Sequence, residues 1–438
     1  MTGLRSDDTA TANATSNVLS FPAYHARSFA IGEVHSRPHP LLSAPRLLVQ
    51  LAFVTEGGAT VDHAVLAELC RRQGVPAPDR DARHYIMRWG RGTLYWERHS
   101  EFSTYMWEAP LSEGGKWKQS SPFGEGFNPP GPVMSGVRLE IHKAGGDKQL
   151  AAFDLDPESM CHSLIEDGKA EILTDFRQDG DGLTRLFVVD HGLTEARTGA
   201  LAQRLIEIET YRVFCMLGLP LAQSLSGQLR RMEDSLAELT NAIRNKGRHE
   251  SEELLGHLTE LAAELEAQAA SSLFRFGASR AYYEIVTERL EALKEKPHEG
   301  GESWATFLTR RVAPAMRTCR SVEDRQANLS RRLTRATQLL RTWVDVEVEK
   351  QNRDLLASMN NRARQQLRLQ QTVEGLSVAA ISYYVVGLIS YMVGGLPILP
   401  QWLQPKTAIS VSVPLVILAL WLVMWRIRRS HRKEADTQ

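Results

Sequence analysis

The chain has 438 residues, enough for two or three domains, and its 52 basic and 52 acidic residues give a formal net charge of zero. This balance, with no basic stripe interleaved with aromatic residues, argues against a nucleic-acid-binding protein. The four cysteines lie far apart without a CxxC pair, which argues against a zinc site built from them. Because Walker, GxGxxG, HExxH and GxSxG motifs are all missing from the sequence, we expect no enzyme.

The N-terminal part predicts a mixed α/β domain over residues 21–192, preceded by a disordered polar segment, residues 1–20. No basic start is followed by an apolar run, so no cleavable signal peptide is expected. Helices are expected over Ala59–Arg72 and, briefly, near Pro157–Ile165. Strands are expected where short apolar or alternating runs lie between turn residues. These runs are Arg46–Val54, His84–Trp89, Thr93–Glu97, Phe102–Glu108, Val137–His142, Ala170–Thr174 and Thr184–Val189.

A charged group beside the aromatic strands is the candidate cytoplasmic site. Alternation places Glu97 and His99 on one face of a strand, and Glu101 follows closely. The competing interpretation is a sheet edge that carries solvated charges. His35 and His39 resemble a metal-binding pair, but the spacing supplies no third ligand, so the sequence identifies no metal.

From residue 193 the hydrophobic period changes to that of helices, and residues 193–320 predict an antiparallel bundle. Its leucine faces must be buried against one another. The expected helices are one that carries Leu201, Leu205 and Ile208, then Leu221–Asn245, Glu252–Ala269, Ser279–Lys294 and a shorter one near Trp304–Arg317.

Residues 321–374 predict a long cytoplasmic stalk helix, because neither proline nor glycine occurs between Val322 and Gly375. Continued into the next apolar run, it is a rod on the order of 110 Å long at 1.5 Å per residue. A solitary helix of that length is implausible in water, so we expect a homo-oligomer. The carboxylates of Asp345, Glu347 and Glu349 would then bind hard cations at subunit boundaries, or simply be solvated.

Two apolar runs predict a membrane anchor. Residues 375–396 are charge-free and, at about 22 residues, long enough to cross a bilayer; residues 408–425, about 18 residues, are near the lower limit. Arginines precede the first run and follow the second, within residues 426–438. The positive-inside rule therefore places both termini in the cytoplasm and the loop, residues 397–407, outside. The competing interpretation is a buried helical hairpin.

One face of the first apolar run is rich in small and hydroxyl-bearing residues, which allow close helix packing and cross-helix hydrogen bonds. Two interpretations stay open: packing against the second run, or lining a symmetric pore in an oligomer. The pore-lining candidates are Ala380, Tyr383, Gly387, Ser390, Tyr391 and Gly394.

Three motifs, EVHSRPHP, WERHSEFSTY and EGLSVAAISYYVVGL, resemble an uncharacterised bacterial family described as membrane-anchored proteins. They cover the chain from about residue 33 to the end. This resemblance implies the bacterial inner membrane as the location, but no particular activity.

The order of elements also resembles the CorA-type magnesium transporters. That order is an α+β cytoplasmic domain, a long-helix bundle and two C-terminal transmembrane helices. The resemblance implies a pentamer in which the first span lines the pore, and a divalent cation such as magnesium. It departs at Tyr391, which is followed by Met392, Val393 and Gly394 instead of Gly-Met-Asn.

The sequence therefore predicts an integral inner-membrane protein that acts as an oligomeric cation channel or transporter gated by its cytoplasmic domain. The alternative is a non-conducting membrane-anchored scaffold or sensor that binds a protein partner. In both cases the lipid bilayer is a partner and nucleic acid is not.

Overall fold

The computed structural model describes residues 17–18, 21–24, 27, 31, 39–55, 57–111, 122–124, 126–145, 153–246, 250–298, 301–394 and 405–435. The chain divides into two compact units, which are described separately. The first contains residues 1–242 and 256–337, and the second contains residues 243–255 and 338–438. His35 and most of the expected disordered segment and outer loop lie outside the described residues.

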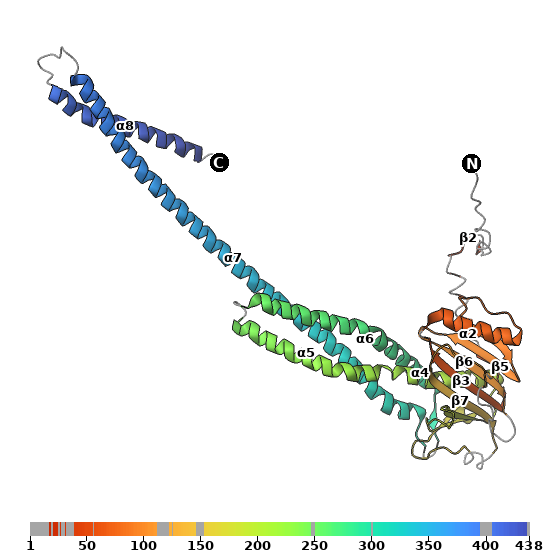
Figure 1. Cartoon of the computed structure of the whole chain (residues 1–438). Coiled ribbons are helices and arrows are strands. Elements are labelled where there is room, and N and C mark those ends of the chain that lie inside the picture. The colour runs from red at the N-terminus through yellow and green to blue at the C-terminus, as the bar shows by residue number, and fades with distance from the viewer. Residues whose placement is uncertain are drawn as a thin grey trace, which may run out of the picture. The chain divides into compact units, whose positions relative to one another are not determined.

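The first unit contains a nine-stranded sheet at one end of its long helices (Figure 1). Its order is β11-β8-β9-β10-β7-β3-β6-β5-β4, and all neighbouring pairs are antiparallel except β10 and β7. In chain order the strands are β3 (Arg46–Val54), β4 (His84–Trp89), β5 (Gly92–Arg98), β6 (Phe102–Pro110), β7 (Val133–Lys143), β8 (Cys161–Ile165), β9 (Ala170–Thr174), β10 (Thr184–Asp190) and β11 (Lys296–Pro297). Outside this sheet, β1 (Asn17–Val18) pairs with β2 (Phe21–Pro22).

All seven strands expected from alternation and apolar runs are present, so the mixed α+β fold with an N-terminal sheet is confirmed. The short helix expected near Pro157–Ile165 is wrong, because Cys161–Ile165 is strand β8. This strand turns Cys161 and Ile165 into the core and pairs with β9 in full antiparallel register. Pairing with a neighbouring strand, which local sequence does not reveal, decides the conformation here.

Each face of the sheet packs against helices. Helix α2 (Gly58–Gln73) covers the β3-β6-β5-β4 half of one face and buries Leu66, Leu69 and Cys70 among the sheet aromatics. The opposite face packs against α4 (Glu195–Cys215) and against parts of two later helices. Two separate apolar layers therefore cover the sheet, and this burial is the main stabilising term of the unit.

Helices α5 (Gly218–Lys246) and α6 (Ser251–Leu293) follow α4 and run beside the next helix (Figure 1). The two helices expected over Glu252–Ala269 and Ser279–Lys294 are a single helix, so that expectation is corrected. The residues between them contain only Gly277 as a weak breaker, and one interior glycine costs about 1 kcal/mol, which packing offsets.

Helix α7 (Trp304–Gly394) is continuous over 91 residues, as the absence of proline and glycine after Val322 predicted. The separate short helix expected near Trp304–Arg317 is wrong, because it forms the start of α7 and tolerates Pro314 within it. Ion pairs hold this start in the bundle of the first unit: Arg325 binds Glu233 of α5 at 2.9 Å, and Glu323 binds Arg280 of α6 at 3.1 Å.

The second unit contains the end of α5, the start of α6, the rest of α7 and helix α8 (Pro405–Ala435). Ile243, Leu254 and Leu340 are its buried apolar side chains, whereas most other apolar side chains described there are exposed. By length and composition, one helix among the described residues, α7, is able to cross a membrane. The apolar stretch of α8, Ser410–Val423, is shorter.

Candidate functional site

The three charged residues predicted to form a cytoplasmic site do not converge. Glu97 and His99 lie close together, with 3.8 Å between Oε2 and Nε2, and His99 stacks on Phe102 at a centroid distance of 4.2 Å. The carboxylate of Glu101 instead forms a bidentate ion pair with Arg275 of α6. This pair joins the β5–β6 turn to the bundle, so Glu101 has a structural partner.

The pore-lining candidates do not enclose a cavity within one chain. Ala380, Tyr383 and Tyr391 are exposed, the two tyrosines at 78% and 85%. Gly387 and Ser390 are half-buried, and the surroundings of Gly394 lie outside the described side chains. This arrangement is the one expected of a face whose partner is lipid or another copy of the chain.

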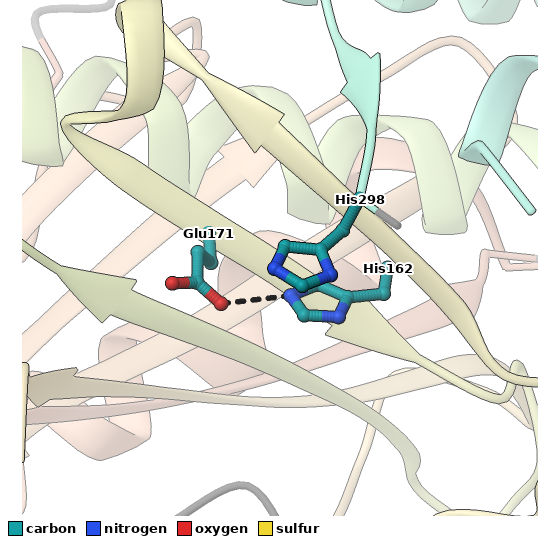
Figure 2. Close-up of side chains that lie close together, drawn as sticks. All are labelled: His162, Glu171 and His298. Atoms are coloured by element: carbon teal, nitrogen blue, oxygen red, sulfur yellow. Dashed lines mark hydrogen bonds and ion pairs between the residues drawn. The ribbon is translucent and has the colours of Figure 1, made fainter. Parts of the chain in front are cut away.

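A cluster of His162, Glu171 and His298 lies at the β11 end of the sheet (Figure 2). His162 is on β8, Glu171 is on β9, and His298 directly follows β11. In the antiparallel register His162 lies opposite Leu173, so Glu171, two residues before Leu173, occupies the diagonal position on the same face. The backbone N–H of His298 donates to the carbonyl of His162 at 3.0 Å, which extends the pairing of β11.

Within the cluster the side chains point at one another (Figure 2). Nε2 of His162 and Oε2 of Glu171 are 2.7 Å apart. The imidazole rings of His162 and His298 are stacked, with centroids 4.1 Å apart and planes 9° from parallel. One ligand atom from each of the three residues lies within 4.8 Å of the others. His162 is buried, and the other two side chains are half-buried.

The surroundings favour a neutral imidazole beside an ionised carboxylate. Burial lowers the pKa of His162, and its hydrogen bond with Glu171 opposes that shift only in part. Burial acts to raise the pKa of Glu171, but hydrogen bonds from His162 and His191 outweigh it and lower this pKa. These are the protonation states in which histidine and glutamate bind metal ions.

Two further histidines lie on the same face of the sheet. His191, just after β10, approaches Oε1 of Glu171 with its Nε2 at 2.8 Å, so both carboxylate oxygens have a histidine partner. On β7, His142 pairs with Glu140 at 3.0 Å. The ring of His142 lies 5.1 Å from that of Phe153, tilted by 49°, and His142 is outside the three-residue cluster.

No pattern in the sequence indicates this cluster of His162, Glu171 and His298. Its members are separated by up to 136 residues, and no spacing rule joins them. The sequence predicts a helix where the structure has β8, and β11 has only two residues, so local sequence does not reveal the register that aligns the three side chains.

A second polar group is buried beneath α2. Oδ1 of Asp62 accepts hydrogen bonds from the hydroxyl groups of Ser103 and Tyr105, at 2.7 and 3.1 Å, and from Nε1 of Trp96 at 3.4 Å. Its other oxygen, Oδ2, is buried with no hydrogen-bond partner among the described residues. Burial raises the pKa of Asp62 despite these three donors. The group holds α2 on the sheet and is closed to solvent, with Asp62 0% exposed.

The comparison with protein families covers nearly the whole chain. Residues 22–431 match the family model described as "Protein of unknown function (DUF3422)", and the chain belongs to this family. The expected membership of an uncharacterised family is confirmed. This match carries no link to CorA-type magnesium transporters, so that resemblance stays a prediction. No curated protein matches the chain.

Proposed function

We propose that this protein is an integral membrane protein in which copies of the apolar end of α7 assemble into a path for cations. The observation that carries the proposal is the continuity of α7. One helix begins in the packed core at Trp304, which is fully buried, and ends in a charge-free segment in which most of the described apolar side chains are exposed. The sheet and bundle are thus linked to the apolar segment by an unbroken helix, and the sheet-and-bundle unit serves as the gate of the path.

Self-association is supported by the part of α7 between the packed core and the apolar segment. Val348, Leu355, Met359 and Val373 are 50% to 61% exposed. At 100° per residue these four side chains fall within a narrow stripe along one side of the helix. The stripe is interrupted by Gln366, and its exposed apolar side chains are stable in water only when another helix covers them. A second copy of α7 offers the same stripe.

Conduction is supported by the composition of the apolar segment. No Asp, Glu, Lys, Arg or His occurs in residues 375–396, so a permeant cation would meet the hydroxyl oxygens of serine and tyrosine side chains instead of fixed charges. Gly387 and the small Ser390 leave room for helices to approach one another closely. The transported ion is proposed to be a divalent cation such as magnesium.

The test is ion flux into liposomes that contain the purified full-length chain, together with the mass of the complex in detergent. Gly387→Leu is expected to abolish flux while the complex keeps its mass, because leucine fills the space that glycine leaves. Leu388→Ile is the matched control, since it changes an exposed neighbour on another side of the same helix.

If Gly387→Leu passed ions as fast as wild type, the face of α7 that contains Gly387 would not line the cation path. A wild-type oligomer that passes no monovalent or divalent ion would overturn conduction and favour the scaffold or sensor. A monomer would overturn self-association.

A further inference from the structure

We propose that His162, Glu171 and His298 bind one divalent transition-metal ion of the class represented by Zn²⁺. The ion would tie the α6–α7 connection to strands β8 and β9. This site lies in the sheet and is independent of the cation path proposed above, so either proposal stands if the other fails.

The donor set selects the class of metal. Imidazole nitrogen suits zinc, copper, nickel and iron, whereas magnesium and calcium prefer oxygen ligands throughout. Two histidines and one carboxylate form a three-ligand set of the kind that zinc sites use when a fourth position is left for water. The ligand atoms lie within 4.8 Å of one another, and nitrogen atoms on one zinc ion are about 3.3 Å apart at bond lengths of about 2.0 Å. A contraction of this size needs side-chain rotation but no movement of the strands.

The stacked rings define which side chain must move. An imidazole nitrogen donates within the plane of its ring, so two parallel rings cannot direct their lone pairs at a single ion. The ring of His298 must therefore turn on binding. It is the better placed of the two to do so, because it is half-buried in the connection, whereas His162 is buried within β8. A neutral His162 that donates from Nε2 to Glu171 carries its proton on Nε2, so binding of the ion at Nε2 requires that this proton move to Nδ1.

The carboxylate is already oriented for this role. Oε1 of Glu171 is held by His191, which leaves Oε2 directed at His162. A hydrogen bond to a metal-binding carboxylate from a side chain outside the ligand set fixes its orientation, and its loss typically lowers affinity by about 10-fold to 100-fold. His191 is therefore a positioning residue for the site.

Because His298 lies in the connection between α6 and α7, a bound ion would attach this connection to the sheet. Strand β11 is only two residues long, and the connection continues from it directly into α7. In the same connection Glu295 accepts hydrogen bonds from the backbone N–H groups of Trp304 and Ala305, the first residues of α7. A metal bond between His298 and the sheet would hold this connection more firmly than its few backbone hydrogen bonds do.

The experiment is a Zn²⁺ titration of the purified full-length chain in detergent, in competition with a chromophoric chelator. One Zn²⁺ per chain is expected. His298→Gln and Glu171→Gln should weaken binding by more than about 100-fold, since each removes a ligand and not only its support, and His191→Gln should weaken it by about 10-fold to 100-fold. His142→Gln is the matched control, because it removes a histidine from the same face without removing a ligand.

Thermal unfolding of each variant without added metal checks that it folds. His298→Gln is the decisive variant, because His298 lies in an edge connection outside the buried core. The proposal is overturned if the wild-type chain binds no Zn²⁺ stoichiometrically, or if folded His298→Gln and Glu171→Gln bind it as wild type does.

Hydrogen–deuterium exchange tests the tie to the connection. In the wild-type chain, Zn²⁺ should slow exchange of the amides of His298 and Gly301, and His298→Gln should lose this protection. Exchange that is unchanged by bound Zn²⁺ would overturn the proposed link between the α6–α7 connection and the sheet.

Discussion

The two units of this chain differ in how far their large side chains are buried. In the first unit, even a buried carboxylate such as Asp62 receives three hydrogen bonds, and Trp96 and Tyr105 are almost entirely enclosed. In the second unit, large apolar side chains such as Tyr383, Leu388 and Trp421 are 59% to 78% exposed. The first unit encloses most of its large apolar side chains, whereas the second leaves most of those described there exposed.

Because of this difference in burial, we expect substitutions in the two units to affect different properties of the protein. Substitutions in the first unit should change the free energy of unfolding and leave membrane association intact. Substitutions in the apolar ends of α7 and α8 should change association and leave the sheet folded.

The largest effect is expected from charges placed in the apolar segments. A double variant, Val386→Asp and Val416→Asp, should leave the membrane fraction, because each aspartate at the centre of a span costs about 2.5 to 3.5 kcal/mol. The measurement is the fraction of protein that resists alkaline extraction from membranes of expressing cells. Val346→Asp with Leu367→Asp is the matched control, since these exposed apolar residues of α7 lie outside both the charge-free segment and the stripe proposed for self-association. Equal retention of both double variants would mean that the apolar ends do not lie in lipid.

The next largest effect is expected at Asp62. Asp62→Ala leaves the Ser103 and Tyr105 hydroxyl groups and the Trp96 N–H without their acceptor, so we expect a loss of about 3 kcal/mol in the free energy of unfolding. Chemical denaturation of the full-length chain measures it, and membrane retention should not change. Glu68→Ala on the exposed side of the same helix should change stability by no more than about 0.5 kcal/mol. If Asp62→Ala lost no more unfolding free energy than Glu68→Ala, the buried group would not hold α2 on the sheet.

The same residue predicts a dependence on pH. Burial raises the pKa of Asp62 in the folded state, so the folded state binds this proton more tightly than the unfolded state. Its contribution to stability is fully present below the ordinary aspartate pKa of about 3.9, and is lost as pH rises through the folded-state pKa. Asp62→Asn does not titrate, so its stability relative to wild type should increase from acid to neutral pH. The gain is about 1.4 kcal/mol for each unit by which the pKa is raised. A difference independent of pH would mean that the pKa of Asp62 is not raised.

The sequence predicted elements whose signals are local. Alternating and apolar runs located β3 to β7, β9 and β10, and the lack of proline and glycine after Val322 predicted the long helix. The boundaries between consecutive helices were harder to predict from the sequence. The sequence predicts breaks between helices at residues 270–278 and 318–321. In the structure α6 and α7 are continuous there, because packing against the neighbouring helices stabilises the helical backbone.

The candidate metal centre shows why local signals are not enough for a site. His162, Glu171 and His298 meet only because β9 pairs with β8 and a two-residue strand from the α6–α7 connection adds to the edge. Histidine spacing instead drew attention to His35 and His39. Glu97 and His99 were correctly placed near each other by alternation along one strand, but the partner of Glu101 comes from α6, 174 residues away.

The smallest effect is expected where α7 begins, and it tests whether the two units respond independently. Glu295 accepts hydrogen bonds from the N–H groups of Trp304 and Ala305, at 3.1 and 2.6 Å, which otherwise have no partner in the first turn of the helix. Glu295→Ala should therefore cost about 1 kcal/mol in unfolding free energy, and Glu295→Gln less, because the amide keeps one acceptor oxygen. Amide exchange of residues 304–307 should quicken in the same order, with no change in membrane retention. If Glu295→Ala also released the protein from the membrane, the start of α7 would control its apolar end, and the two regions would not be energetically separate.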